Sequence, residues 1–268
     1  MTRGRDSRSR SVEWDGYAES WLTEKPQRIW RQHSDALNAR LIRRWLPSEP
    51  MELIVKTDLF DEAVTGGLYT TMLERARRVA ALDVSPIIAS AARAKHPAML
   101  TFGADVRHVP LLDECADAVV SLSTLDHFDS VDEIPLALRE IHRILKRDGT
   151  LILTMDNPSN PILAIRNSIP FSVMRRAGLV PYPIGRTHSI RAMSRLIQEA
   201  GFDVLDRTAI MHAPRLLAIQ ALRFARRKKG QSGQTLGKTL MAFEVLERLP
   251  TRYHTGHFIA IRAIKADV

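Results

Sequence analysis

From residue 52 onward, short apolar segments alternate with stretches of helical periodicity, and this alternation constrains the fold more than any other feature of the sequence. A strand, a helix and another strand in succession are typical of a parallel sheet with crossover helices. Seven segments are predicted as strands, at residues 52–56, 78–83, 99–103, 117–123, 150–156, 203–212 and 257–265. We therefore predict an α/β fold with helices on both faces of a mostly parallel, seven-stranded sheet.

The remaining segments divide the chain into further parts. Residues 1–12 are polar and arginine-rich and are predicted to form a disordered basic arm. Residues 13–47 show two runs of helical periodicity, which we interpret as an N-terminal helical lid. The α/β domain takes residues 48–268 and carries two insertions. The insertion at 157–188 has five prolines and is expected to form a cap, whereas that at 214–250 is expected to be helical and begins with a basic amphipathic stretch.

Composition limits the partners and the location that we expect. The single cysteine, Cys115, excludes an internal disulfide. No apolar run is long enough to span a bilayer and no signal-peptide pattern is visible, so we expect a cytoplasmic protein without a transmembrane segment. The net charge of +9 raises nucleic acid or anionic lipid as partners. However, the basic residues are widely spread and aromatic residues make up only 6%, so nucleic acid is unlikely. Weak contact with a membrane surface remains possible.

The turn after the first predicted strand is unusual. Nucleotide-binding α/β folds have a glycine-rich turn there, whereas this chain has KTDLFDEA, which lacks glycine and contains three acids, Asp58, Asp61 and Glu62. Such an acidic turn would repel a pyrophosphate, which needs backbone N–H groups at a helix N-terminus. The turn therefore disfavours NAD and ATP as ligands. The segment that follows, residues 66–78, is predicted to be a helix.

Acids also follow the second and third predicted strands. Because ligands of doubly wound sheets bind beyond the carboxyl ends of the strands, both acids are candidate site residues. Asp83 ends the second strand, where a carboxylate can accept both hydroxyls of a ribose or simply be solvated. Asp105 follows the third strand, where it can accept from an adenine amino group while the N–H of Val106 donates to the ring. A turn aspartate that bonds its own backbone is the alternative interpretation of Asp105.

The order of ALDVSP, AARAKHP, ADVRHVP and REIHRILKRDGTLIL resembles that in the class I S-adenosylmethionine-dependent methyltransferases, particularly their small-molecule group. The resemblance covers residues 52–156 and implies a Rossmann-like fold with S-adenosylmethionine as cofactor. It also implies that residues 121–127, after the fourth strand, line the cofactor. The first motif departs from the family pattern, because that pattern has an acid followed by alternating glycines.

The resemblance predicts a set of cofactor-binding residues: Tyr17, Thr57, Asp58, Asp61, Asp83, Val84, Asp105, Val106 and Ser123. Unlike NAD, this cofactor has no phosphate but carries a positive sulfonium and a positive ammonium. Asp58, Asp61 or Glu62 can therefore face its cations. Tyr17 belongs to an aromatic N-terminal element that folds over the cofactor in this group, although its spacing also fits an ordinary packing face.

The acceptor side of the site is less clear from the sequence. His127, in STLDHF, lies where a general base can deprotonate an acceptor hydroxyl, although a histidine packed at the head of a helix is the more ordinary explanation. Tyr182, Arg186 and His188 of the cap are polar groups that can orient an acceptor, or they belong to an internally satisfied loop. No His/Asp/Glu spacing predicts a metal site.

These observations predict an S-adenosylmethionine-dependent methyltransferase that acts on an oxygen or nitrogen of a small organic acceptor. Two alternatives stay open. A methyltransferase acting on RNA is favoured if basic residues surround the cofactor mouth, and a non-catalytic binding protein is favoured if the acidic turn fills the cofactor pocket. The acceptor and the oligomeric state do not follow from the sequence.

Overall fold

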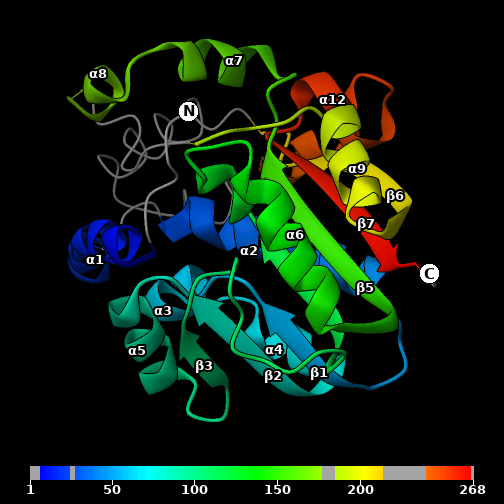
Figure 1. Ribbon diagram of the computed structural model, residues 1–268. Helices are drawn as coiled ribbons and strands as arrows, with labels where there is room; N and C mark the ends of the chain where they lie inside the picture. The colour runs from blue at the N-terminus through cyan, green and yellow to red at the C-terminus, as the bar shows by residue number, and fades with distance from the viewer. Residues whose placement is uncertain (1–6, 25–27, 177–184, 214–239, 267–268) are drawn as a thin grey trace.

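The computed structural model describes residues 7–24, 28–176, 185–213 and 240–266 (Figure 1). Seven strands form one sheet in the order β3-β2-β1-β4-β5-β7-β6. The strands are β1 Met51–Lys56, β2 Ala76–Asp83, β3 Leu100–Gly103, β4 Ala116–Leu122, β5 Leu145–Asp156, β6 Phe202–Ile210 and β7 Phe258–Lys265. The predicted seven-stranded α/β fold is thus confirmed.

Strands β1 to β5 are parallel to their neighbours, and β7 pairs antiparallel with both β5 and β6. Consequently the carboxyl ends of the five parallel strands meet at one edge of the sheet. The order reverses direction between β1 and β4, where the chain crosses from one half of the sheet to the other. Ligands of open α/β sheets bind at such a switch point.

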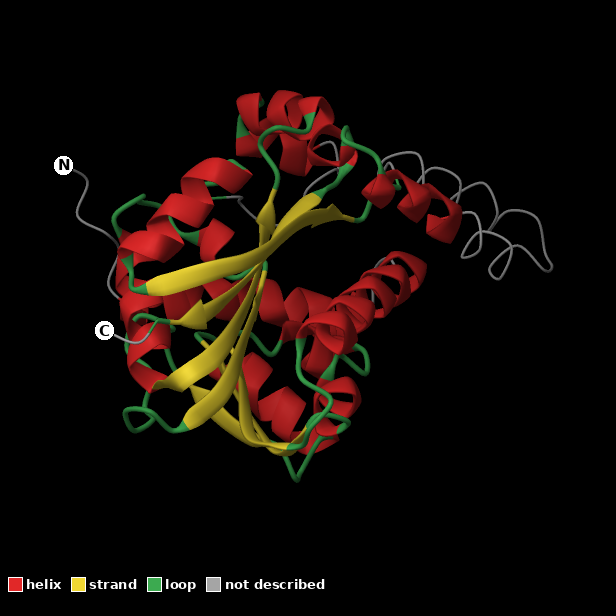
Figure 2. Ribbon diagram, turned by 90° about the vertical axis from the view of Figure 1, so that its right-hand side faces the viewer, coloured by secondary structure: helices red, strands yellow, loops and turns green. Residues whose placement is uncertain are grey.

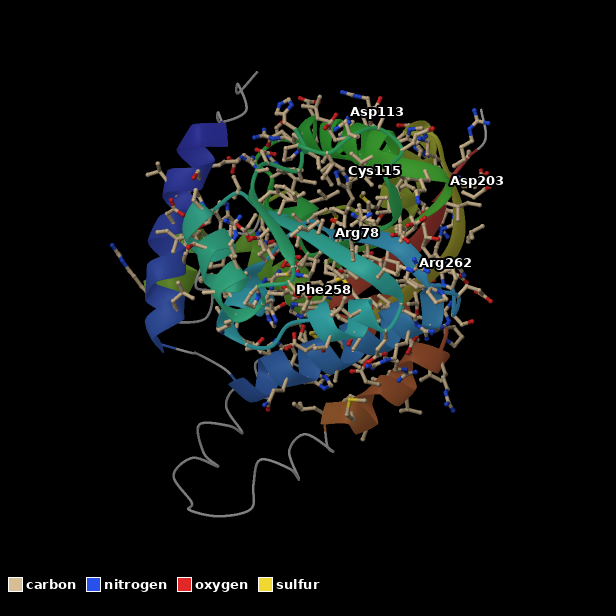
Figure 3. All side chains as sticks on the ribbon, turned by 90° about the horizontal axis from the view of Figure 1, so that it is seen from below. Arg78, Asp113, Cys115, Asp203, Phe258 and Arg262 are labelled. Atoms are coloured by element: carbon tan, nitrogen blue, oxygen red, sulfur yellow. The ribbon has the colours of Figure 1, made fainter. Side chains whose placement is uncertain are left out.

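Helices cover both faces of the twisted sheet, as Figure 2 shows. One face carries α2 Arg28–Trp45, α3 Phe60–Val64, α4 Tyr69–Leu73 and α5 Pro86–Lys95, and the other carries α6 Glu133–Ile144 and α9 Ile190–Glu199. The strands are buried on both faces, so successive apolar residues serve opposite cores. Ile54 packs in the cluster under α2, whereas Val55 packs in the cluster under α6. In the view from below, Phe258 lies toward the middle of the molecule, whereas Asp113 and Asp203 lie at its edge (Figure 3).

The N-terminal region is more ordered than the sequence predicted. Helix α1 extends from Ser7 to Glu24, so residues 7–12 are helical and are not part of a disordered arm. The side chain of Arg10 explains this difference, because it is buried and bonded to Glu133. The two helical runs predicted for this region are confirmed, since α2 begins at Arg28.

The predicted helix over residues 66–78 is largely wrong. Only the short α4 lies within it, and β2 already begins at Ala76. Gly67, which has a positive φ of 58°, breaks the helical pattern. A Cβ at this glycine would lie 2.5 Å from the side chain of Glu62, so the position also leaves room for that buried acid. The turn after β1 instead leads directly into α3.

The cap insertion is described in part. It contains α7 Pro161–Ser168 and α8 Phe171–Arg176, and residues 177–184 lie outside the described part of the chain. Gly185 lies against the short helix η1 Leu125–His127, and the N–H of Gly185 donates to Asp126 O. A Cβ at Gly185 would lie 2.2 Å from Phe128 O, so this close approach needs glycine.

The C-terminal insertion is described only at its end. It includes η2 Phe243–Arg248, and α12 Arg252–Thr255 follows it before β7. Most of the predicted basic helix, residues 214–235, lies outside the described residues. Within the described ranges, no helix combines the length and apolar character that a bilayer crossing requires.

Candidate active site

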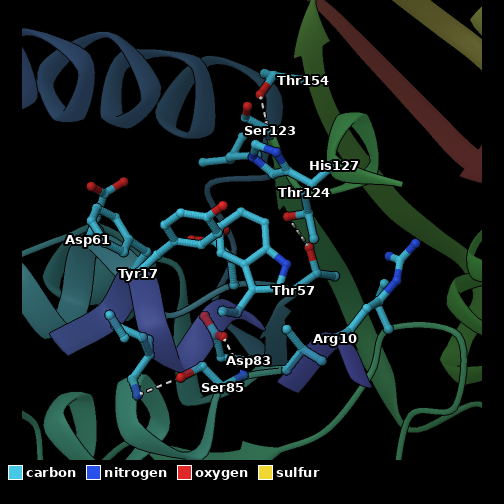
Figure 4. A pocket seen from close by; sticks show the side chains of 18 of the residues that line it. Arg10, Tyr17, Thr57, Asp61, Asp83, Ser85, Ser123, Thr124, His127 and Thr154 are labelled. Atoms are coloured by element: carbon cyan, nitrogen blue, oxygen red, sulfur yellow. Dashed lines mark hydrogen bonds between the residues drawn. The ribbon is translucent and has the colours of Figure 1, made fainter. Parts of the chain in front are cut away.

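A cavity of about 220 Å³ lies at the carboxyl edge of the sheet. Figure 4 shows side chains that converge on it from the lid helix and from the strand ends. All nine residues predicted to bind the cofactor line this one cavity: Tyr17, Thr57, Asp58, Asp61, Asp83, Val84, Asp105, Val106 and Ser123. His127, the predicted base, lines it too. Sequence segments far apart therefore meet at the switch point.

Asp83 is held rigidly at the end of β2. Its Oδ2 accepts the N–H of Leu59 at 3.0 Å, and its Oδ1 accepts the N–H of Ser85 at 2.9 Å. Burial raises the pKa of Asp83 to about 6, although these two bonds and Lys56 favour the ionised form. Ser85 caps α5 and also donates to Asp15 of α1. Each oxygen of Asp83 keeps a lone pair for a further donor.

Asp105 belongs to a buried chain of charges that reaches the lid helix. Its carboxylate accepts the backbone N–H and the Nε–H of Arg107, each at 2.9 Å. Arg107 also donates to Glu133, and Glu133 accepts two bonds from Arg10 at 2.9 and 2.8 Å. The guanidinium of Arg10 also stacks over the Phe128 ring, with its carbon 4.8 Å from the ring centre. The acid at the expected adenine position is thus coupled to α1.

Two aromatic side chains of α1 form one wall of the cavity. The rings of Trp14 and Tyr17 meet edge to face with centres 5.7 Å apart. Trp14 also contacts His127, with ring centres 5.0 Å apart and planes at 69°. The geometry gives Tyr17 a position over the strand ends rather than in an ordinary core.

The acidic turn after β1 is neutralised in large part by a lysine that the sequence analysis missed. Lys56 is 1% exposed, and its Nζ donates to Asp58 Oδ1 at 2.7 Å and to Glu62 Oε2 at 2.9 Å. Asp61 instead accepts from Arg31 of α2 at 3.1 Å. Glu62 is fully buried beneath the turn, where its other oxygen accepts the N–H of Leu68. Asp58 and Asp61 reach the cavity, whereas Glu62 does not.

Acids still outnumber cations in this cluster, because Asp35 of α2 adds a fourth carboxylate. Burial and repulsion from Asp61 and Glu62 raise the pKa of Asp35 to about 7. Burial likewise raises the pKa of Asp58 to about 7, although Lys56 opposes this effect. Burial alone would lower the pKa of Lys56, but its acidic neighbours hold it above the ordinary value. The region therefore carries a negative potential toward the cavity.

Hydroxyl groups line the middle of the cavity, at the ends of β1, β4 and β5. Thr57 donates to Ser121 at 3.0 Å and contacts Thr124 Oγ1 at 2.9 Å. Ser123 has a positive φ of 51°, which is rare for a residue with a side chain. This backbone is held because the Ser123 N–H donates to Thr154 O and its hydroxyl donates to Asp126. Strained residues of this kind concentrate at functional sites.

His127 lies next to a buried carboxylate. Its Nε2 is 3.9 Å from Asp126 Oδ1, and this oxygen accepts no hydrogen bond from the described residues. Burial and the nearby Asp156 raise the pKa of Asp126, whereas His127 lowers it. A carboxylate in this position can stabilise the protonated form of a histidine.

Of the predicted acceptor-binding residues, the two that the structure describes, Arg186 and His188, do not line this cavity. The N–H of Arg186 donates to Phe128 O, and the N–H of His188 donates to Met155 Sδ, but neither residue lines the cavity wall. Tyr182 lies outside the described residues. Among the residues that the structure describes, no group of His, Cys, Asp and Glu side chains is arranged to hold a metal ion.

Several lining residues come from helices that the sequence analysis read only as a lid. They are Arg10, Trp14 and Ala18 of α1 and Trp30, Arg31, Ser34 and Asn38 of α2. Lys56, which lies behind the cavity wall, did have a signal in the sequence, because a charged residue directly follows the apolar run LIV. Arg10 and Asn38 had none, because only tertiary packing brings them to the strand ends.

The sheet order and the helices on both faces define a Rossmann-like fold of the kind found in class I methyltransferases. Comparisons with known proteins agree. Residues 61–153 match the family described as "Methyltransferase domain". This match, together with the relatives found by sequence, supports a class I S-adenosylmethionine-dependent methyltransferase.

The relatives found by sequence are mycobacterial. A "Probable S-adenosylmethionine-dependent methyltransferase" of Mycolicibacterium smegmatis is 28% identical over 153 residues, which cover 54% of this chain and 51% of that protein. A protein of the same description from Mycobacterium tuberculosis is 27% identical over 146 residues, with 54% and 48% covered. The chain thus spans about half the length of each of these relatives.

Solved structures share the fold. A chain from the complex of the Haloferax volcanii Trm112 methyltransferase activator with a methyltransferase has a TM-score of 0.60 at 18% identity, covering 94% of this chain and 99% of that chain. An S-adenosylmethionine-dependent methyltransferase from Mesorhizobium loti has a TM-score of 0.56 at 15% identity, covering 84% and 96%. At such low identity the likeness establishes the fold alone.

Proposed function

We propose that this chain binds S-adenosylmethionine and transfers its methyl group to an oxygen or nitrogen of a small organic acceptor. The observation that carries the proposal is the single cavity, whose wall runs from Asp83 and Asp105 at one end to Asp58 and Asp61 at the other. Acids at the first end suit a ribose and an adenine. The negative potential at the other end suits a ligand with positive charge and no phosphate.

The lining residues fit this cofactor better than a dinucleotide. Two of the carboxylates around the turn have pKa values raised to about 7, so a cationic ligand that favours their ionised forms gains from binding there. When bound, the cofactor supplies an electrophilic methyl group on its sulfonium. A pyrophosphate would instead meet Asp58 and Asp61 in place of backbone donors.

The chain's own residues supply orientation, shielding and a proton acceptor. Trp14 and Tyr17 cover the strand ends and exclude water, which strengthens the electrostatic interactions inside the cavity. His127 takes the proton of the acceptor hydroxyl or amine, and the carboxylate of Asp126, 3.9 Å away, stabilises the resulting imidazolium. Holding the acceptor in line with the methyl group supplies much of the rate acceleration.

A small acceptor is favoured over RNA by the charges at the cavity. The only Arg or Lys residues among its described lining are Arg10 and Arg31, and each is paired with an acid. Four aspartates line the same wall: Asp58, Asp61, Asp83 and Asp105. Because such a mouth repels phosphates, we expect RNA binding to be weak and steeply salt-dependent. The turn also does not fill the cavity, which argues against a scaffold without a cofactor. We further propose a cytoplasmic location, on the basis of the single cysteine.

Calorimetric titration tests the proposed function. The purified chain is titrated separately with S-adenosylmethionine, S-adenosylhomocysteine and ATP, and we expect it to bind the first two and not ATP. Failure of the parent chain to bind either of the first two ligands would contradict the proposal. Tight binding of a structured RNA that survives physiological salt would instead favour an RNA substrate.

A further inference from the structure

The charged side chains of the cavity belong to one part of its wall. Those that line it in the described structure are Arg10, Arg31, Asp58, Asp61, Asp83 and Asp105. They come from α1 and α2 and from the ends of β1, β2 and β3. Strands β4, β5 and β7 lie on the other side of β1, and the described lining from these strands and from the segment after β4 includes no Asp, Glu, Lys or Arg. In Figure 4, Asp83 accordingly lies on the opposite side of the view from Ser123 and Thr154.

Three apolar side chains line the part of the cavity that lacks these charges. We call them the apolar wall: Trp30 of α2, Leu122 at the end of β4 and Phe258 at the start of β7. Phe258 is half-buried, and it packs against the core cluster that contains Leu122 and the one that contains Trp30. The His257 ring centre lies 4.7 Å from that of Phe258 and 6.3 Å from that of Trp30. These contacts hold both aromatic rings in place at the cavity.

The hydroxyls beside the apolar wall are bonded within the protein. Thr154 Oγ1 accepts the N–H of Ser123 at 3.1 Å, and the Ser123 hydroxyl donates to Asp126 at 2.9 Å. Thr124 Oγ1 lies 2.9 Å from Thr57 Oγ1. A ligand with many hydroxyls, such as a sugar, loses its hydration here and finds few uncommitted partners in return.

The apolar wall also disfavours a charged acceptor. A carboxylate or phosphate placed against it would lose hydration without gaining a free cation, because Arg10 is paired with Glu133 and Arg31 with Asp61. A flat, apolar ring loses little hydration there. It can also pack on aromatic side chains in the offset or edge-to-face arrangements that such rings prefer.

We propose that the acceptor is a neutral, phenol-type aromatic compound whose ring packs against Phe258 and Trp30 and whose hydroxyl faces His127. Both His127 and Phe258 line the one cavity, whereas Arg186 and His188 of the cap do not. The inference rests on the proposed function, because it specifies the acceptor of the same reaction. The charged part of the cavity stays with the cofactor.

Three probes test the class of acceptor. At pH 7, 2-naphthol is neutral, 2-naphthoate carries a negative charge on the same rings, and glucose is neutral but polar. Equilibrium dialysis measures the binding of each probe to the full chain saturated with S-adenosylhomocysteine. We expect 2-naphthol to bind at least about tenfold more tightly than 2-naphthoate, and glucose not to bind, because the apolar wall compensates neither charge nor hydroxyls for lost hydration.

A variant of the apolar wall connects the preference to its residues. Phe258→Ala should weaken 2-naphthol at least about tenfold through the loss of apolar contact area, and it should leave S-adenosylhomocysteine within about twofold. Phe102→Ala is the matched control. Phe102 is also a half-buried phenylalanine in a strand, but it packs in the other core cluster and does not line the cavity. This control should bind both ligands like the parent.

Ser34→Lys provides a test that removes no core side chain. Ser34 is half-buried, lines the cavity and lies one helical turn after Trp30. A lysine at this position adds a cation beside the apolar wall and should shift the preference toward 2-naphthoate at least about tenfold.

The outcomes separate this inference from the proposed function. Equal affinities of the parent for 2-naphthol and 2-naphthoate, absence of 2-naphthol binding, or an unchanged 2-naphthol affinity in Phe258→Ala would overturn the inference while the proposed function stands. Failure of the parent to bind S-adenosylhomocysteine, measured before any probe is added, would instead count against the proposed function itself.

Discussion

Lys56 Nζ lies 2.9 Å from Glu62 Oε2, and both side chains are buried under the turn that follows β1. The same ammonium lies 2.7 Å from Asp58 Oδ1. An internal cation thus accompanies the acids that take the place of glycine in this turn. The turn derives its shape from ion pairing and not from the conformational freedom of glycine.

Removal of this cation should destabilise the fold. Lys56→Met leaves buried carboxylates without their partner, and breaking a buried ion pair costs about 3–5 kcal/mol. Urea denaturation measures the loss, which Glu62→Gln in the same chain should partly restore. Lys146→Met is the control: it breaks the more exposed pair with Asp117, and such pairs contribute about 0–1 kcal/mol. Equal stabilities of the two lysine variants would contradict this account of the turn.

Asp83→Ala should weaken S-adenosylmethionine at least about tenfold, because the ribose loses hydrogen bonds to a charged acceptor. Asp117→Ala is a matched control. Asp117 also accepts two backbone N–H groups, from Glu52 and Leu53, but at the opposite end of the strands. Calorimetry should show the loss of affinity for Asp83→Ala alone. Equal affinities of these two variants would remove Asp83 from the binding site.

The acids at the cavity should distinguish the cofactor from adenosine. Asp58→Asn and Asp61→Asn are expected to weaken S-adenosylmethionine, whose charges interact with an acid at about 4 Å by about 4 kcal/mol before desolvation. Both variants should bind adenosine like the parent, since adenosine carries neither cation. Glu62→Gln should alter stability more than ligand preference, because Glu62 does not reach the cavity. An unchanged ratio of the two affinities in every variant would show that the acids serve only the turn.

Stability should fall as the pH rises from about 4 to 7. The pKa of Asp35 is raised to about 7 in the folded chain. The unfolded value is about 4, so between these values the folded state holds a proton that the unfolded state has lost. The stabilisation is therefore complete below the unfolded pKa and is lost as pH rises through the folded one. Asp35→Asn should flatten this dependence in urea melts at pH 5, 6, 7 and 8, and a parallel curve for the variant would contradict it.

The pair of Arg10 and Glu133 should control the escape of a bound nucleoside. Arg10→Met removes the buried bonds that fix α1, which carries Trp14 and Tyr17 over the cavity. We expect S-adenosylhomocysteine to dissociate at least about tenfold faster, as breaking a buried pair favours the open lid. Stopped-flow fluorescence measures this rate. Arg44→Met is the control: it breaks an exposed pair with Glu247 and should leave the dissociation rate unchanged. An unchanged rate in Arg10→Met would show that α1 is not a lid.

Local sequence patterns were sufficient for the sheet and for the positions of Asp83 and Asp105 at its carboxyl edge. Asp83 and Asp105 follow apolar runs directly, so their position at the carboxyl edge follows from the strand assignment alone. The segment after the first turn was mispredicted because Gly67 adopts a positive φ where helical periodicity suggested a continuous helix. Lys56 appears as a charge at the end of an apolar run, yet its two partners depend on the conformation of the turn.

The lid residues could not be predicted in the same way. Arg10 finds its partner Glu133 at a separation of 123 residues, and no local pattern encodes such a pair. Asn38 appears as one polar residue in a helix with many, and only the packing of α2 against the sheet turns it toward the cavity. The prediction of a disordered arm was wrong for residues 7–12 for the same reason, since burial of Arg10 orders the start of α1.

The packing of α2 has a consequence for the order in which the chain folds. Ile42 and Trp45 share a core cluster with Ala260, and Trp30 packs with Phe258. Helix α2, which comes early in the chain, therefore packs against β7, the strand that comes last. Such contacts have a very large sequence separation and form slowly, because a long loop must close first. During synthesis α2 emerges well before β7. We therefore expect the wall that carries Asn38 to be assembled late, only after β7 has left the ribosome.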